Sequence, residues 1–340
     1  MSNKKEKVLI TGISGWIAQF CALELIKQGY IVKGSLRTMN RQDEVTEALS
    51  KVVDVKNKLE FCQLDLLNDS GWNEAMYDCS YVLHVASPFF VNEPKNENDY
   101  ITPAKYGTLR ALKSAQKASV KRVVITSSIV AMNGHLKTGQ FTPKTWTNLD
   151  KQYNINAYQK SKTIAEQAAW EFMKNLPKDS SLELTVINPG AVLGPALSTD
   201  IQGASLDICA QLLTGKMPGI PNLTIPMVDV RDVAMHHVKA MTHPDAKNKR
   251  LISALAEPTP FLHLAKTLKA HGYNVPTKKV PSWLLKIMSF IDPQAKAMLS
   301  LIDRHVSCDN SETINMFNWK PLPLEQTFLD MAESVKKQLK

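Results

Sequence analysis

The sequence has few cysteines and no long hydrophobic run. Its 340 residues include five cysteines, an odd number, and none forms a Cys-x-x-Cys pair. This pattern does not indicate a disulfide framework, so we expect reduced thiols in a cytoplasmic protein. The short apolar run before Gly12 does not suit a signal peptide. The apolar stretch 281–302 carries Lys286 and Asp292, which predicts amphipathic helices and no transmembrane segment; contact with a membrane surface remains an alternative.

Several motifs of other enzyme classes are also missing. There is no G-x-S-x-G elbow and no Walker A pattern. His236 and His237 are adjacent, which does not match a metal-ligand spacing on a helix, so no metal is expected. The net charge is +9, but the basic residues are spread along the chain with no recognised nucleic-acid-binding module. The charge therefore favours an anionic cofactor or substrate over nucleic acid.

The first half of the chain alternates apolar runs of strand length with longer helical patterns. This alternation predicts a Rossmann-type α/β fold, a doubly wound parallel sheet. The expected strands are Lys7–Thr11, Tyr30–Leu36, Leu59–Leu64, Tyr81–Val85, Arg122–Thr126 and Leu184–Asn188. The expected helices are Gly15–Gln28, Arg41–Lys51, Gly71–Met76 and Pro103–Ala118.

After Pro189 and Gly190, proline and glycine become frequent and the strand–helix rhythm weakens. We therefore predict a cofactor-binding domain over residues 1–188 and a smaller, partly helical C-terminal substrate lobe over residues 189–340. The pattern of a short strand and a helix between Met227 and Met241 indicates that the chain returns to the first domain at about residues 225–245.

A glycine-rich turn follows the first strand. Gly12 permits a tight turn there, and Gly15 allows the backbone to approach a pyrophosphate at the start of the helix, where backbone amides favour an anion. The turn with its flanking residues Ser14, Trp16 and Ile17 predicts a dinucleotide site, although an ordinary strand-to-helix turn is the alternative.

The end of the second strand bears on the choice of cofactor. An acidic residue there would bind the ribose 2′-hydroxyl of NAD, whereas an arginine accommodates a 2′-phosphate. The sequence has Arg37, with Arg41 nearby and no carboxylate before Asp43. We therefore expect NADP(H), without excluding NAD(H); two solvated surface arginines are the alternative.

Two further strand ends contribute candidate cofactor contacts, because ligands of open α/β sheets bind at the carboxyl ends of the strands. Asp65 and Leu66 follow the third strand, and Asp65 is expected at the adenine edge unless it only caps a helix. The segment after the fourth strand supplies Val85, Ala86 and Ser87.

Tyr158 and Lys162 carry the expected chemistry. Residues four apart share one face of a helix, so Lys162 can bring its charge near the phenol. Lowering the pKa of a phenol from about 10 to about 7 takes roughly 4 kcal/mol, which one nearby unit charge can supply. The hydroxyl cluster Thr126, Ser127 and Ser128 ends the fifth strand, and Ser128 is expected to bind a substrate oxygen. A helix or turn cap is the alternative for this cluster.

These motifs together resemble the extended short-chain dehydrogenase/reductase family. The resemblance rests on TGISGWIA at 11–18, DL at 65–66, HVASPF at 84–89, ITSS at 125–128, YQKSK at 158–162 and NPG at 188–190. The HVASPF segment, Arg37 and the ending NWKPLPLEQTF are similar to the branch of dihydroflavonol reductases, cinnamoyl-CoA reductases and related aldehyde and ketone reductases.

The resemblance implies a cytoplasmic NADPH-dependent oxidoreductase that reduces a carbonyl group. It implies that Tyr158 gives the proton, Ser128 orients the oxygen and Lys162 also holds the nicotinamide ribose, with Ser127 left as an alternative to Ser128. It further implies that Pro189 and Val192 flank the nicotinamide, that residues 229–234 brace the cofactor domain, and that the protein is a monomer or homodimer.

Other functions use the same features. A hydroxysteroid dehydrogenase differs in direction and pocket, a sugar-nucleotide epimerase or dehydratase keeps NAD tightly bound, and a non-catalytic dinucleotide sensor needs no Tyr158–Lys162 pair. The substrate is expected to be a hydrophobic or aromatic carbonyl. Its pocket is expected to include Phe89, Phe90, Met132, Asn133 and the lobe after Val192.

Overall fold

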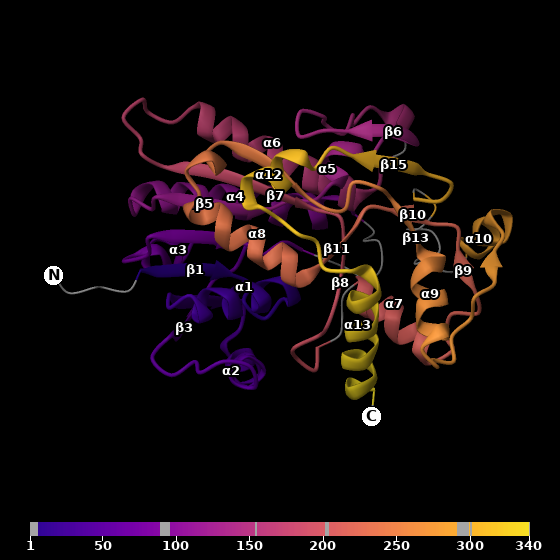
Figure 1. Cartoon of the computed structure of the whole chain (residues 1–340). Helices are drawn as coiled ribbons and strands as arrows, with labels where there is room; N and C mark the ends of the chain where they lie inside the picture. The colour runs from indigo at the N-terminus through magenta and orange to yellow at the C-terminus, as the bar shows by residue number, and fades with distance from the viewer. Residues whose placement is uncertain are drawn as a thin grey trace.

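A computed structural model describes residues 6–88, 96–153, 155–200, 204–290, 299 and 301–339. In Figure 1 the strands of a large sheet and their covering helices lie on the left, and the helices α7, α9, α10 and α13 gather on the right. Among the helices of these ranges, none combines the length and the apolar character needed to cross a bilayer.

Within the described ranges, the largest sheet has seven strands, all parallel, in the order β3-β2-β1-β4-β5-β7-β12. This is the expected doubly wound Rossmann-type sheet. Its strands are β1 (Lys7–Thr11), β2 (Ile31–Leu36), β3 (Leu59–Gln63), β4 (Tyr81–His84), β5 (Arg122–Thr126), β7 (Glu183–Pro189) and β12 (Lys249–Ser253). Sequence analysis did not identify β12, which pairs with β7 from far along the chain.

Helices cover both faces of this sheet. The helices α1 and α8 pack together on one face, and α3, α4 and α6 pack together on the other. These helices and their neighbours are α1 (Trp16–Lys27), η1 (Met39–Arg41), α2 (Gln42–Ser50), α3 (Trp72–Met76), α4 (Asn98–Lys117), α6 (Ala157–Lys174) and α8 (Val230–Thr242). The return of the chain after Met227 thus places α8 beside α1.

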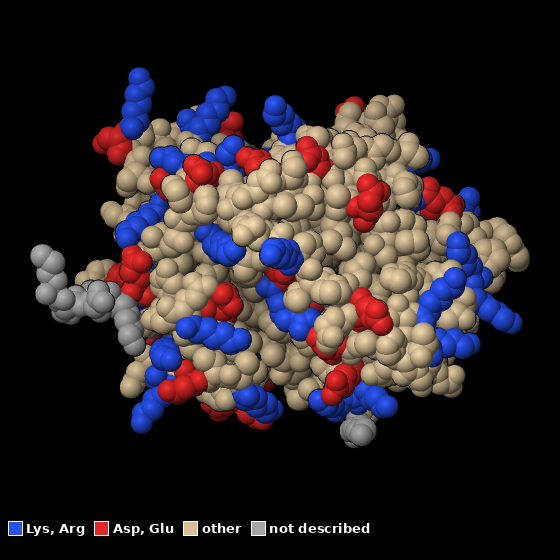
Figure 2. Space-filling model, viewed as in Figure 1, with Lys and Arg blue, Asp and Glu red and all other residues tan. Residues whose placement is uncertain are grey.

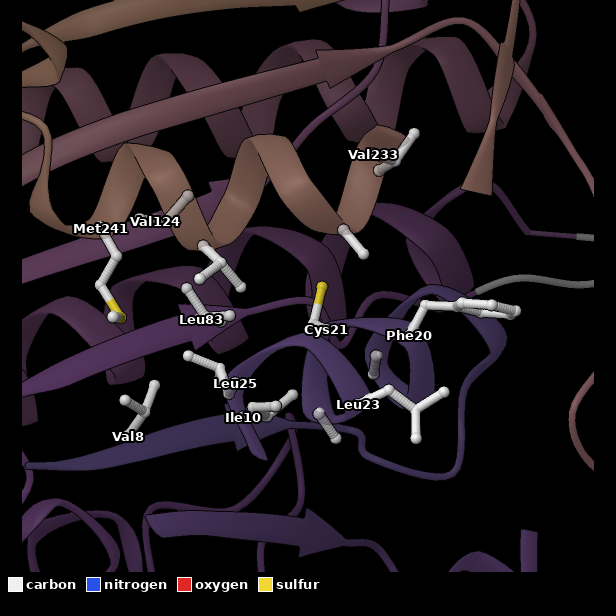
Figure 3. Packing of buried hydrophobic residues seen from close by; sticks show 14 of the residues in the cluster. Val8, Ile10, Phe20, Cys21, Leu23, Leu25, Leu83, Val124, Val233 and Met241 are labelled. Atoms are coloured by element: carbon white, nitrogen blue, oxygen red, sulfur yellow. The ribbon is translucent and has the colours of Figure 1, made fainter. Parts of the chain in front are cut away.

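The strand β1 shows how alternation builds two cores. Val8 and Ile10 point into the cluster formed with α1 and α8, whereas Leu9 points into the cluster on the opposite face. Figure 3 shows Val8 and Ile10 with Cys21 of α1 and Val233 of α8 in the first cluster. Apolar residues on both faces of a strand are typical of a sheet covered by helices on both sides.

The helix α4 differs from its prediction. It begins at Asn98, five residues before the expected start at Pro103, which lies inside the helix. The expectation used proline as a mark of the first helical turn. Here the helix tolerates Pro103 near its start, where the missing N–H removes a single bond, to the carbonyl of Asp99.

The remaining elements form short sheets and a helical cluster. The apolar faces of α7, α9 and α13 pack into one core. The helices are α5 (Val130–Asn133), η2 (Lys151–Tyr153), α7 (Ala204–Leu213), η3 (Pro244–Ala246), α9 (Phe261–Ala270), α10 (Ser282–Met288), α12 (Ser311–Phe317) and α13 (Leu324–Gln338). The paired strands are β6 (Thr138–Phe141) with β15 (His305–Cys308), β8 (Ala191–Leu193) with β11 (Met227–Asp229), β9 (Ile220–Pro221) with β14 (Lys279–Val280), and β10 (Thr224–Ile225) with β13 (Thr259–Pro260).

Basic and acidic side chains mix over most of the face in Figure 2. The helix α10 falls within the apolar stretch 281–302, of which residues 291–298 and 300 lie outside the described ranges. Trp283, Ile287 and Phe290 in this stretch are exposed.

Candidate active site

The glycine turn joins β1 to α1 and is fixed from two sides. Gly12 has a φ of +67°, and its N–H donates to the Oγ of Ser35 at the end of β2 over 3.0 Å. A Cβ atom added to Gly12 would lie 3.0 Å from the Cβ of Ala86, which follows β4. The turn therefore needs glycine at position 12 both for its backbone conformation and for close packing.

The start of α1 is open to a ligand. Gly15 caps this helix and is exposed, while Ser14, Trp16 and Ile17 are partly buried. Among the described residues, no side chain caps the helix, and its first turn contains no acidic residue. The free amides and the positive end of the helix dipole suit an anionic group such as a pyrophosphate.

Arg37 and Arg41 have different surroundings. The guanidinium of Arg41 donates to Glu44 over 2.8 Å and to Asp200 over 2.7 Å. The side chain of Arg37 is exposed and makes no ion pair with any residue in the described ranges, while its backbone carbonyl accepts from Gln63. Arg37 is therefore the more available of the two arginines for a phosphate.

Asp65 and Leu66 have structural partners at the end of β3. The Asp65 carboxylate accepts from the backbone N–H of Leu67 over 2.8 Å, which forms a local turn, whereas the next helix, α3, has Gly71 as its N-cap. The carbonyl of Leu66 accepts from Arg110 over 2.7 Å. These contacts hold the segment after β3 beside α4.

The segment after β4 is tied to β1 through a buried hydroxyl. Thr11 Oγ1 accepts from the N–H of Ala86 over 3.0 Å and lies 2.9 Å from Nδ1 of His84. Burial, and then the charge of Lys162, lower the pKa of His84 to about 3, so its ring is neutral and shares a hydrogen bond with the Thr11 hydroxyl. Val85, Ala86 and Ser87 are thereby held at the carboxyl edge of the sheet.

The structure brings Ser128, Tyr158 and Lys162 together where β5 meets α6. A capping box between Asn156 and Gln159 fixes the start of α6, one turn before Lys162. The side chains of Ser128 and Tyr158 are hydrogen-bonded. Lys162 Nζ donates to the carbonyl of Thr126 at the end of β5 over 3.3 Å.

The electrostatics of Tyr158 differ from the expectation of a lowered pKa. Burial raises the pKa of Tyr158 to about 12, and the hydrogen bond from Ser128 offsets only part of this rise. Burial also lowers the pKa of Lys162 to about 8, against the opposing effect of Glu166. At neutral pH the phenol is therefore protonated, which suits a proton donor, and most of the lysine is charged.

Ser127 and Ser128 point to different partners. The Ser127 hydroxyl donates to a carboxylate oxygen of Glu166 over 2.6 Å, away from the phenol. Ser128 contacts Tyr158, and its hydroxyl also accepts from the N–H of Val130 over 3.3 Å. This arrangement favours Ser128 as the serine that contacts a substrate oxygen.

The end of β7 and the residues after it run from the β5 side of the site toward α1. The carbonyl of Pro189 accepts from the N–H of Ile129 over 3.0 Å, and Val192 packs partly buried against the α1 core. The indole of Trp16 donates to the carbonyl of Pro195 over 2.7 Å. Pro189 and Val192 therefore lie on the stretch that leads from the β5 side back to the start of α1.

The expected substrate residues are only partly described. Phe89 and Phe90 lie outside the described residues. Met132 is fully buried with Phe141, so its side chain packs in a core, and the carbonyl of buried Asn133 accepts from Arg304. These burials argue against Met132 as a direct substrate contact.

Sequence analysis missed a buried carboxylate beside the triad. Glu166 accepts from Ser127, from Asn188 over 2.8 Å, from Arg250 over 2.5 Å and from Trp170 over 3.3 Å. The spacing of four residues from Lys162 was a usable signal for Glu166. No local signal pointed to Arg250, which lies on the strand that the analysis did not identify.

The described residues offer no group of side chains suited to binding a metal ion. Within the described ranges, no three His, Cys, Asp or Glu side chains gather in a way that could hold a metal ion. His236 and His237 are each buried with a polar partner, Ser253 and the hydroxyl of Thr126 respectively.

Known proteins with similar sequences are reductases. The sequence pattern of the NAD dependent epimerase/dehydratase family matches residues 8–254. The chain is 35% identical to cinnamoyl-CoA reductase CAD2 of Medicago truncatula over 257 residues, which cover 74% of this chain and 77% of that protein. It is 29% identical to tetraketide alpha-pyrone reductase 1 of Arabidopsis thaliana over 328 residues, which cover 89% and 98% of the two chains.

Solved structures extend this similarity to the whole fold. Yeast methylglyoxal/isovaleraldehyde reductase Gre2, complexed with NADPH, superposes with a TM-score of 0.79 at 27% identity, covering 97% of this chain and 98% of that one. Gre2 of Candida albicans in complex with NADPH gives a TM-score of 0.80 at 25% identity, with coverages of 98% and 100%.

Proposed function

Since the chain belongs to the NAD dependent epimerase/dehydratase family, the extended short-chain dehydrogenases and reductases, we propose that it reduces an aldehyde or ketone to an alcohol with NADPH. The observation that carries this proposal is the hydrogen-bonded pair of Ser128 and Tyr158, with Lys162 on the same helix, beside an open glycine turn. The enzyme is an NADP-dependent oxidoreductase whose relatives include cinnamoyl-CoA reductases.

The residues present fit an NADP cofactor. The tight turn at Gly12 and the uncapped start of α1 suit the pyrophosphate, and the exposed Arg37 suits the 2′-phosphate. When bound, NADPH supplies a hydride for the carbonyl carbon. We assign the remaining cofactor contacts to residues of the glycine turn, of the strand ends and of α6: Ser14, Gly15, Trp16, Ile17, Asp65, Leu66, Val85, Ala86, Ser87, Thr126, Tyr158, Lys162, Pro189 and Val192.

The protein's own residues manage the proton. Tyr158 is protonated at neutral pH and donates its phenolic proton to the carbonyl oxygen, while the hydroxyl of Ser128 orients that oxygen. The ammonium of Lys162 lies one helical turn away and stabilises the phenolate that remains. Tyr158 is partly buried, and the ring of the buried Tyr100 of α4 packs edge-on against it, with the two ring centres 6.0 Å apart.

The proposed substrate is a hydrophobic or aromatic carbonyl compound, and the similarity to cinnamoyl-CoA reductase and to methylglyoxal/isovaleraldehyde reductase supports this class. We assign cofactor binding to residues 1–188 together with the return segment at about 225–245, which we extend to β12. Substrate binding is assigned to the lobe within residues 189–340.

We further propose a cytoplasmic monomer or homodimer without a nucleic-acid partner. The five free cysteines support a reducing compartment.

The test is NADPH oxidation by the purified protein against a panel of aliphatic and aromatic aldehydes and ketones, with NADH in parallel. We expect turnover with NADPH, and a loss of about a hundredfold or more in Tyr158→Phe, because the proton donor is removed. NADPH affinity in that variant should stay within a few fold of wild type. Tight NADPH binding without turnover on any substrate would favour the sensor, and equal turnover by Tyr158→Phe would reject the assigned proton donor.

A further inference from the structure

A carboxylate is buried directly behind the proposed triad. Glu166 lies on α6 four residues after Lys162, and the residue is 1% exposed. In Figure 1 α6 lies over the sheet beside α4. Glu166 and Lys162 line the same small pocket, together with His84 of β4 and Thr108 of α4. Burying an ionised carboxylate is costly unless it is paired and hydrogen-bonded.

The carboxylate joins the ends of three neighbouring strands. Its oxygens accept from the Ser127 hydroxyl after β5, from the Asn188 amide on β7 and from the Arg250 guanidinium on β12, at 2.6, 2.8 and 2.5 Å. The Asn188 amide also donates to the carbonyl of Ser128 over 3.2 Å. Asn188 thus connects the Glu166 carboxylate to the backbone of Ser128, whose side chain contacts Tyr158.

Arg250 is itself held in place. Its Nη1 donates to the carbonyls of Pro143 and Thr145 over 2.7 and 2.8 Å, and its guanidinium lies 3.6 Å from the centre of the Trp146 ring. A planar guanidinium bound in this way is rigid, and it fixes the carboxylate that it contacts.

The groups around Lys162 in the described part of the chain come from several elements. His84 of β4 is neutral, the Tyr158 phenol of α6 is protonated at neutral pH, and Arg250 of β12 is paired with Glu166. Burial lowers the pKa of Lys162, and the carboxylate of Glu166 is the group that raises it. The buried carboxylate therefore favours the charged form of Lys162, which burial opposes.

We propose that Glu166 is a positioning residue of this active site. Its carboxylate keeps the Lys162 ammonium charged and, through Asn188, holds Ser128 in position. This inference rests on the proposed function, because it assigns Glu166 its role through Lys162 and Ser128. Glu166 touches neither substrate nor cofactor in this role. Because Arg250 lies on β12, at the edge of the sheet, its ion pair connects that strand to the residue that positions Lys162 and Ser128.

The first test is the pH profile of kcat/KM for Glu166→Gln. The substitution keeps the shape and removes the charge, so the pH above which activity falls should drop by about one unit relative to wild type. The matched control is Glu171→Gln, the same change at an exposed position of α6, which should leave the profile unchanged. Glu166→Asp, which keeps the charge, should restore most of the alkaline limb.

A second measurement needs no turnover. Lysine labelled with ¹³C at Cε allows the Lys162 resonance, assigned with Lys162→Arg, to be titrated by NMR in the unliganded protein. We expect its midpoint to fall in Glu166→Gln and to stay in Glu171→Gln. A midpoint and an alkaline limb that both coincide with wild type in Glu166→Gln would overturn the inference, whereas a wild type that turns over no carbonyl would overturn only the proposed function.

A variant with no unpaired buried charge covers the case in which Glu166→Gln does not fold. The double variant Glu166→Gln/Arg250→Met removes both members of the ion pair, and such neutral replacements are often tolerated. The lysine midpoint should again lie below that of wild type. An unchanged midpoint in this variant would likewise overturn the inference.

Discussion

Replacing Arg37 with serine isolates the charge that we assign to the 2′-phosphate. The side chain is exposed at the end of β2, and the backbone is held separately, because the carbonyl of Arg37 accepts from Gln63 over 3.1 Å. The substitution therefore removes charge without releasing the turn. It should weaken binding of NADPH and leave binding of NADH nearly unchanged, since NADH lacks the phosphate.

The size of the effect follows from the exposure of Arg37. A unit charge about 4 Å from another contributes about 1 kcal/mol in water and about 4 kcal/mol at an effective dielectric of 20. An exposed guanidinium lies near the lower end, at about 1–2 kcal/mol, which corresponds to a loss of roughly 5- to 30-fold in NADPH affinity. Because exposed charges are screened, the loss should shrink as salt is added.

The assay is calorimetric titration of wild type, Arg37→Ser and Arg41→Ser with NADPH and with NADH at two salt concentrations. Arg41→Ser is the matched control, since Glu44 and Asp200 already engage that guanidinium. Equal losses for the two cofactors in Arg37→Ser would refute the reasoning. A larger and NADPH-specific loss in Arg41→Ser would show that Arg41 leaves its carboxylates to bind the phosphate.

Two further predictions concern stability and the glycine turn. Burial lowers the pKa of His84 and His236 to about 3 and of His237 to about 4, so these rings stay neutral in the fold while the unfolded chain takes up protons below about pH 6.5. The free energy of unfolding should therefore fall as the pH falls from 6.5, by up to about 2 kcal/mol per ring at pH 5. Urea unfolding of wild type and His84→Asn at pH 7 and pH 5 checks this, because the variant should lose less stability between the two pH values. Gly12→Ala should lower stability and NADPH affinity through both strain and a steric clash, whereas Gly272→Ala, with a φ of +85° in open space, should show only the strain of about 1–2 kcal/mol. Equal effects of the two alanines on unfolding and no change in NADPH affinity would contradict the assigned role of the turn.

Most of the large sheet could be predicted from sequence because its strands carry a local signal. The six predicted strands match the structure within one residue at each end, since a buried parallel strand is a short apolar run bounded by turn residues. The strand β12, KRLIS, has only a short apolar part and begins with two charged residues. Arg250 of this strand is satisfied only by partners distant in sequence, so nothing local identified it.

In the site, too, the features that depend on local sequence could be predicted, whereas those that depend on long-range packing could not. The spacing of Tyr158 and Lys162 on a helix follows from the chain alone, but burial of the phenol, which sets its pKa, depends on packing against Tyr100 of α4. Likewise, the turn contact of Asp65 and the carboxylate contacts of Arg41 arise from side-chain geometry and long-range pairing. Sequence analysis indicated the types of group at the site, and the fold determined their partners and protonation.

The position of β12 at the edge of the sheet also bears on how the protein is made. While the ribosome synthesises the chain, β7 emerges about sixty residues before β12, and until then the outer edge of β7 has no strand to pair with. Glu166 would meanwhile be buried without the guanidinium of Arg250. The nascent dinucleotide domain therefore stays incomplete until residue 253 has left the ribosome, and truncated chains that end before β12 should depend on chaperones and aggregate when these are absent.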